Sequence, residues 1–215
     1  MSKIDSVLEV IDMSILEKKV LAPGIVEFQF LEQSAFILKT LIDDFASAIW
    51  EKAKVLNVNK DLDINYSARR CYIKFINRSA ESCHPQDPLA ILWNSLEVGI
   101  QPMFEEYRKM YSLKELNSLH WQLTKYEKDD MFHGHFDDSA QFPRVLSVSI
   151  FLNDDYLGGD LIFEHFNLNI TPKAGKVIFF SSSHPYMHLI SPVISGVRYS
   201  AVRWYNHSGK EMIGT

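Results

Sequence analysis

The chain has 215 residues, of which 47% are hydrophobic, 13% aromatic and 23% charged. These values predict one globular domain and exclude a disordered chain, a collagen and a long coiled coil. The net charge of −5 argues against a nucleic-acid binder, and two cysteines make no disulfide framework. Because no signal peptide or transmembrane span is evident, we expect a cytoplasmic protein with no membrane contact.

The first half of the chain, residues 1–114, mixes helical patterns with short strands. Residues 25–30 read IVEFQF, which favours a strand, and Ser34 is the predicted N-cap of an amphipathic helix. Pro88 is expected to open a second helix, which Pro102 should kink or restart. We expect this half to support a core formed by the rest of a single domain.

The second half, residues 115–207, is a succession of short alternating segments separated by turn signals. Strands at this spacing predict a mixed α+β but mainly β fold, with a sandwich or jelly-roll core. Two antiparallel sheets that close on each other leave a mouth between them, and we expect the ligand site there.

The densest polar cluster on a predicted strand is His133, His135 and Asp137, whose side chains should share one face. His135, Asp137 and a later histidine would make a facial triad suited to non-haem Fe(II). His133, His135 and a later histidine would instead make a three-histidine zinc site. The third ligand is His184 or His188, and local spacing does not choose between them.

Four ordered sequence blocks resemble one known family. Residues 126–137 read Y-E-K-D-D-M-F-H-G-H-F-D, similar to the Y-x-x-G-x-x-F/Y-x-x-H-x-D segment of prolyl 4-hydroxylase-like Fe(II)/2-oxoglutarate dioxygenases. Residues 188–200 resemble the H-x-V-x-P-V-x-x-G-x-R/K segment of that family. The blocks F-L-N at 151–153 and G-G-D-L at 158–161 resemble the segments between them. One departure is Asp129, which stands where the family pattern has glycine.

The resemblance implies His135, Asp137 and His188 as metal ligands, Arg198 as the anchor of 2-oxoglutarate, and a Tyr126 hydroxyl that reaches this co-substrate. The implied reactants are Fe(II), 2-oxoglutarate and O2, with ascorbate as a candidate reductant. Charge counting agrees, because Fe(II), one aspartate and the 2-oxoglutarate dianion leave one net negative charge for a buried arginine to cancel. A guanidinium can also bind a carboxylate through two parallel hydrogen bonds.

The resemblance further implies a double-stranded β-helix core over residues 115–207, braced by N-terminal helices. It favours hydroxylation of a peptidyl proline, with a free amino acid as the alternative substrate. A different class of function is a cupin-like zinc jelly roll that acts as a hydrolase or a non-enzymatic sensor. Such a protein would use His133, His135 and His188, and it gives Arg198 no role. The basic residues around Arg69 are predicted to form a solvated strand face.

Overall fold

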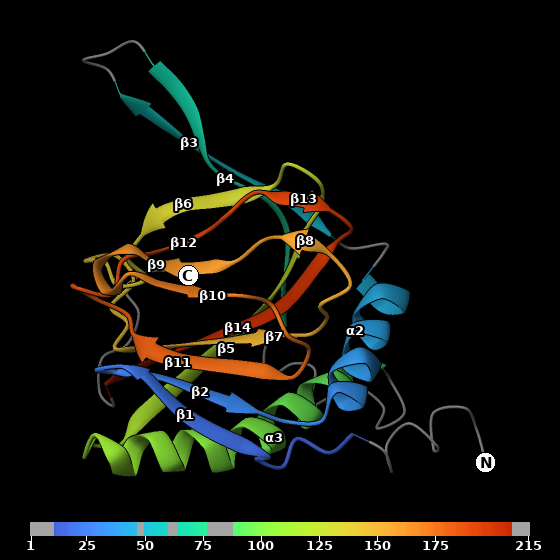
Figure 1. Ribbon diagram of the computed structural model, residues 1–215, viewed down its shortest axis with the longest axis vertical. Helices are drawn as coiled ribbons and strands as arrows, with labels where there is room; N and C mark the ends of the chain where they lie inside the picture. Colours follow the sequence, from blue (N-terminus) through green and yellow to red (C-terminus); the bar gives the residue numbers. More distant parts are fainter. Residues whose placement is uncertain (1–10, 47–49, 60–63, 77–87, 208–215) are drawn as a thin grey trace.

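The computed structural model describes residues 11–46, 50–59, 64–76 and 88–207 (Figure 1). The helices are α2 (Glu32–Ala46) and α3 (Pro88–Met110), with a short 3-10 turn at Glu164–Phe166. The strands are β1 (Glu17–Ala22), β2 (Ile25–Gln29), β3 (Glu51–Asn59), β4 (Ile64–Ile76), β5 (Leu116–Tyr126), β6 (Met131–His135), β7 (Leu146–Phe151), β8 (Leu157–Gly158), β9 (Leu161–Phe163), β10 (Leu168–Ile170), β11 (Lys176–Ser181), β12 (His188–Ile190), β13 (Val193–Ser195) and β14 (Arg198–His207).

Most of these strands belong to one large antiparallel sheet that curls nearly into a barrel (Figure 1). Its order along the described chain is β1-β2-β11-β7-β14-β5-β4-β6-β12-β9-β10, with β3 paired to β4, while β8 and β13 form a separate pair. The α+β, mainly β prediction is confirmed. Strands from the first 114 residues are part of this sheet, because β2 pairs with β11 and β4 lies between β5 and β6.

Side chains on each strand alternate between the two faces of the sheet, as the period of two requires. On β14, Tyr199, Ala201 and Tyr205 belong to the hydrophobic core under the helices, whereas Arg198 and Ser200 face the barrel interior. A second, smaller apolar cluster fills the interior around Phe163 and Phe180. The sheet therefore has one face for stability and one face that mixes apolar and polar side chains.

Helix α3 covers the outer face of the sheet beside β1 and β2 (Figure 1). Its buried stripe includes Phe104, which stacks on Tyr205 with ring centroids 4.4 Å apart, and Tyr107, which stacks on Phe179 at 5.4 Å. Burying an aromatic side chain of this kind contributes about 1.5–3 kcal/mol. None of the described helices has the length and apolar character needed to cross a membrane.

Two details of the predicted helices differ from the structure. Ser34 is not an N-cap, because α2 begins at Glu32 and the Ser34 hydroxyl accepts a hydrogen bond from the Asp12 backbone N–H at 2.8 Å. Pro88 does begin α3, as predicted, but Pro102 does not restart it, because the helix continues to Met110. Packing of the buried stripe holds the helix together across the proline.

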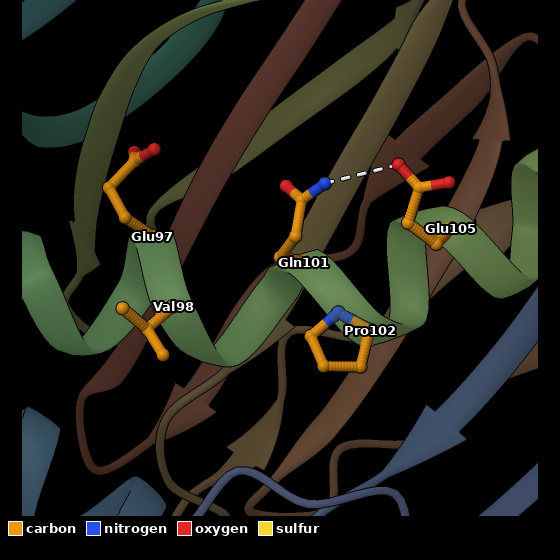
Figure 2. Close-up of a pocket in the computed structure, with 5 residues that line it drawn as sticks. All are labelled: Glu97, Val98, Gln101, Pro102 and Glu105. Carbon is orange, nitrogen blue, oxygen red and sulfur yellow. Dashed lines mark hydrogen bonds between the residues drawn. The ribbon is translucent and has the colours of Figure 1, made fainter.

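The outer side of α3 carries a shallow groove lined by Glu97, Val98, Gln101, Pro102 and Glu105 (Figure 2). Pro102 has no backbone N–H, so the Val98 carbonyl loses its helical partner at this point. Gln101 donates a hydrogen bond to Glu105 at 3.1 Å along the rim. The groove contains none of the residues of the candidate metal centre described below.

The turn between β5 and β6 contains Asp129, the residue that departs from the glycine of the family pattern. Asp129 adopts φ of +67°, the left-handed region that favours glycine and that aspartate can also enter. Its N–H donates to the carbonyl of Val193, and the N–H of Val193 donates to the carbonyl of Asp130. The turn is therefore held against β13 with a glycine-type backbone.

Candidate metal centre

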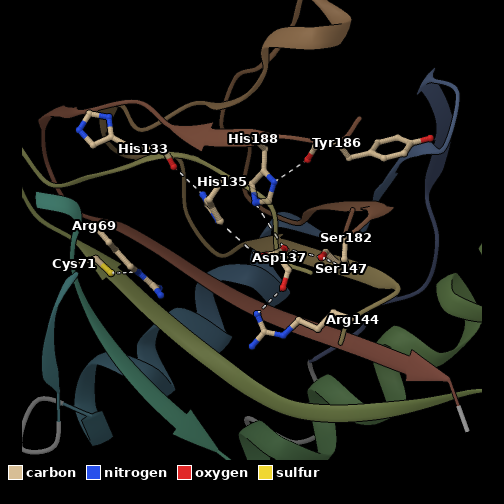
Figure 3. Close-up of polar contacts among 10 residues, drawn as sticks. All are labelled: Arg69, Cys71, His133, His135, Asp137, Arg144, Ser147, Ser182, Tyr186 and His188. Carbon is tan, nitrogen blue, oxygen red and sulfur yellow. Dashed lines mark hydrogen bonds and ion pairs between the residues drawn. The ribbon is translucent and has the colours of Figure 1, made fainter. Parts of the chain in front are cut away.

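Three side chains converge at one end of the barrel interior: His135, Asp137 and His188 (Figure 3). One nitrogen from each imidazole and one carboxylate oxygen lie within 4.8 Å of one another, close enough to hold a single metal ion. His135 Nε2 is 3.6 Å from Asp137 Oδ1, and His188 Nε2 is 3.7 Å from Asp137 Oδ2. Asp137 and His188 are buried, while the His135 side chain is 21% exposed and forms the open side.

Strand pairing brings these residues together from positions about fifty residues apart. His188 on β12 lies directly opposite His135 on β6, and their rings are 4.3 Å apart. Asp137 follows the end of β6, where its backbone N–H donates to the carbonyl of Ser182 at 3.0 Å. That hydrogen bond turns the chain after β6, so that the Asp137 carboxylate points to the two imidazoles.

Backbone carbonyls orient both histidines. His135 Nδ1 lies 2.8 Å from the His133 carbonyl oxygen, and His188 Nδ1 lies 3.2 Å from that of Tyr186 (Figure 3). A carbonyl can only accept, so each Nδ1 carries a hydrogen, and Nε2 is the ring nitrogen that faces Asp137. This arrangement is typical of histidines that ligate metals.

Two serines orient the carboxylate. Ser147 donates to Asp137 Oδ2 at 2.6 Å, and the Ser147 and Ser182 hydroxyl oxygens are 2.8 Å apart. Burial alone would raise the pKa of Asp137, but the charge of His188 and hydrogen bonds from His135 and Ser147 lower it well below its ordinary value. Burial lowers the pKa of His188 to about 4 against the opposing charge of Asp137. Near neutral pH both groups are therefore deprotonated, as metal ligation requires.

The alternative histidines do not join this cluster. The His133 ring points away from the other three side chains, and the residue is exposed (Figure 3). His184 is also exposed and lies 6.2 Å, between ring centroids, from Phe136 and from His165. The described residues thus offer a two-histidine, one-carboxylate group at this place and not a group of three histidines.

Arg198 lies deeper in the interior and is 1% exposed. Its Nη1 donates to Ser200 Oγ at 2.8 Å, and its guanidinium lies 5.1 Å from the ring centroids of both Tyr126 and Phe151. Among the described residues no ion pair joins Arg198 to a carboxylate, and its buried Nε has no hydrogen-bond partner. A buried charge left in this state costs several kcal/mol, so the site is suited to an anionic ligand.

Tyr126 lies opposite Arg198 across the β5–β14 pair and is 2% exposed. Burial and the nearby Cys71 raise the pKa of Tyr126, against the opposing charges of Arg69 and Arg198. Its hydroxyl is therefore protonated at neutral pH and can act as a hydrogen-bond donor. The structure brings Tyr126 and Arg198 side by side, while their contact with 2-oxoglutarate stays a prediction.

Two arginines near the triad were not predicted to contribute to the site. Arg69, expected on a solvated face, stacks on Phe132, which in turn stacks on the His135 ring at 3.6 Å. Arg144 donates to the Asp137 carbonyl at 3.3 Å. Both side chains reach toward the triad (Figure 3). The alternation of β4 could have indicated that Arg69 shares a face with buried Cys71, but not that this face is internal.

Comparison with known proteins agrees with this geometry. The sequence model of the 2OG-Fe(II) oxygenase superfamily matches residues 121–206, which contain the triad and Arg198. A protein of Acanthamoeba polyphaga mimivirus named "Putative prolyl 4-hydroxylase" is 26% identical to this chain over 126 residues, or 49% of this chain and 52% of that protein. The chain thus spans about half the length of that relative.

Solved structures of known oxygenases share the fold of this chain. A Trichoplax adhaerens prolyl hydroxylase in complex with a hypoxia inducible factor peptide superposes with a TM-score of 0.64 at 15% identity, over 85% of this chain and 83% of that one. A Burkholderia pseudomallei protein of the 2OG-Fe(II) oxygenase family superposes with a TM-score of 0.61 at 18% identity, over 99% and 95%. The predicted double-stranded β-helix core with N-terminal helices is confirmed.

Proposed function

We propose that this protein is an Fe(II)- and 2-oxoglutarate-dependent dioxygenase that hydroxylates an unactivated C–H bond. The observation that carries the proposal is that one interior holds both the triad and a buried Arg198, which forms no ion pair among the described residues. Two imidazoles and one carboxylate bind ferrous iron on one face and leave the other coordination positions free. The zinc alternative has no comparable support, since it needs His133 and gives Arg198 no ligand.

The charges of the site fit the proposed reactants. Ferrous iron with the Asp137 carboxylate and two neutral imidazoles carries one net positive charge, which the 2-oxoglutarate dianion turns into one negative charge. The positive charge of the Arg198 guanidinium would cancel this remaining negative charge. Arg198 is thus proposed to bind the distal carboxylate, with Tyr126 as a further donor to this co-substrate.

When bound, ferrous iron supplies the oxidising chemistry, in which decarboxylation of 2-oxoglutarate to succinate and CO2 is coupled to hydroxylation by O2. The residues of this chain would hold the iron and shield it from water. Ser147 and the carbonyls behind the histidines orient the three ligands. Phe132 stacks on His135, and Phe180 packs edge-on against His188 at 4.7 Å, so both imidazoles have apolar walls that keep water away.

We propose a peptidyl proline as the substrate, with a free amino acid as the alternative. The names of the mimivirus relative and of the Trichoplax structure support the first choice. Incubation with a panel of proline-containing peptides and of free amino acids tests it, with succinate formation as the measurement. Proline-dependent stimulation of succinate release is expected, and stimulation by free amino acids alone would contradict the peptidyl assignment. The same assay with and without ascorbate tests the proposed reductant.

The cofactor assignment is tested without turnover. Anaerobic addition of Fe(II) and 2-oxoglutarate should produce the weak visible charge-transfer band of their chelate. Asp137→Ala should abolish the band because iron loses its carboxylate, and Arg198→Ala should raise the 2-oxoglutarate concentration needed to form it.

Matched controls are Asp138→Asn, which changes the neighbouring carboxylate outside the triad, and Arg108→Gln on the outer helix α3. Both should retain the band. Absence of a band in the unmodified protein, or an unchanged band in Asp137→Ala and Arg198→Ala, would refute the proposed function.

A further inference from the structure

Tyr156 is a buried tyrosine whose hydroxyl has no hydrogen-bond partner among the described residues. It lies in the connection between β7 and β8 and is 8% exposed. A phenol without a partner is costly in a protein interior, where phenylalanine would pack without that cost. The unpaired hydroxyl therefore points to a ligand.

Tyr156 packs beside Arg198, because both side chains lie against Gly159. A Cβ atom at Gly159 would lie 2.9 Å from Arg198 Cδ and 3.0 Å from Tyr156 Cε2, so both side chains contact the same glycine. Burial raises the pKa of Tyr156, and the nearby positive charge of Arg198 opposes the rise. The hydroxyl is protonated near neutral pH and available to donate.

Within the part of the chain that the structure describes, two neighbouring buried donors thus lack partners: the Tyr156 hydroxyl and Arg198 Nε. The Ser200 hydroxyl is not an acceptor for these two donors, because it already accepts from Arg198 Nη1 and lies 2.5 Å from the Thr124 hydroxyl. Phe151, the inward residue at the end of β7, brings no polar atom. A carboxylate has two oxygens and can accept from several donors at once.

We propose that Tyr156 is a co-substrate-binding residue whose hydroxyl donates a hydrogen bond to the distal carboxylate of 2-oxoglutarate, alongside Arg198. This inference rests on the proposed function and extends it to a residue outside the matching sequence blocks. It makes Tyr156 a determinant of selectivity for 2-oxo acids that carry a second carboxylate.

Tyr156→Phe removes only the hydroxyl and tests the proposal by binding. Anaerobic titration of the Fe(II)-loaded protein with 2-oxoglutarate, followed by the visible band, should give a Kd at least about 10-fold higher than that of the unmodified protein. With 2-oxopentanoate, which replaces the distal carboxylate by a methyl group, the two proteins should bind equally. The matched control Tyr205→Phe, a buried tyrosine on the helix side of β14, should leave the Kd for 2-oxoglutarate unchanged.

The outcomes separate this inference from the proposed function. A normal band with an unchanged Kd in Tyr156→Phe would overturn the role of Tyr156 and leave the dioxygenase assignment intact. An equal loss of affinity for 2-oxopentanoate would also overturn it, because the effect would then not involve the distal carboxylate. No band in the unmodified protein would overturn both. A thermal unfolding measurement on each variant shows whether it is folded before its Kd is compared with that of the unmodified protein.

Discussion

Ser147 offers a test of how the interior prepares the proposed metal site. Its side chain is fully buried, and its hydroxyl donates to Asp137 Oδ2 at 2.6 Å while it contacts the Ser182 hydroxyl at 2.8 Å. Ser147→Ala removes the hydrogen bond that orients the carboxylate without adding volume. A hydrogen bond to a charged group contributes about 1.5–3 kcal/mol, and loss of such a supporting contact typically weakens metal binding about 10- to 100-fold.

Anaerobic calorimetric titration with Mn(II), an oxygen-stable probe for Fe(II), measures this effect. We expect the Kd of Ser147→Ala to rise by about 10- to 100-fold. The matched control is Ser149→Ala, a buried serine two residues further along the same face of β7. It should bind Mn(II) as the unmodified protein does. Equal affinity in Ser147→Ala, or an equal loss in Ser149→Ala, would refute the idea that Ser147 acts through Asp137.

Three further outcomes follow from the packing. Phe179→Ala, in the core against Tyr107, should lower the free energy of unfolding by about 3–5 kcal/mol in a denaturant titration. Gly159→Ala should weaken binding of 2-oxoglutarate in the band titration, because φ is +66° and the new Cβ would press on Arg198. Glu97→Ala should destabilise the protein by about 1–3 kcal/mol, because Arg203 Nη1, at 2.7 Å, and Trp121 Nε1 both lose their acceptor.

Each of these three substitutions has a matched control. Val98→Ala, at a position that is 75% exposed, should change stability by less than about 0.5 kcal/mol. Gly134→Ala should fit, because its nearest neighbour would lie 3.5 Å from the new Cβ, an ordinary contact. Gln101→Ala, on the exposed side of α3 near Glu97, should leave stability nearly unchanged. A control substitution that lowers stability or 2-oxoglutarate affinity as much as the substitution it is matched with would contradict the contact assigned to that residue.

Local pattern was enough to predict much of the fold and part of the site. Strand alternation predicted a mainly β core, because one buried face imposes a period of two on the sequence. The spacing of His133, His135 and Asp137 predicted that two ligands could come from one segment, since alternate residues share one face, but it left open which two. Pro88 marked the start of α3 because proline suits the first turn of a helix.

The tertiary structure explains why distant residues lie together in the candidate site. Local spacing did not choose between His184 and His188, the resemblance implied His188, and the register of β12 against β6 places His188 opposite His135. The internal position of Arg69 depends on β4 lying between β5 and β6, and that of Tyr156 on its contact at Gly159. Sequence determined what each segment could form by itself. Long-range pairing decided which side chains share the interior, because register and packing depend on segments far apart in the chain.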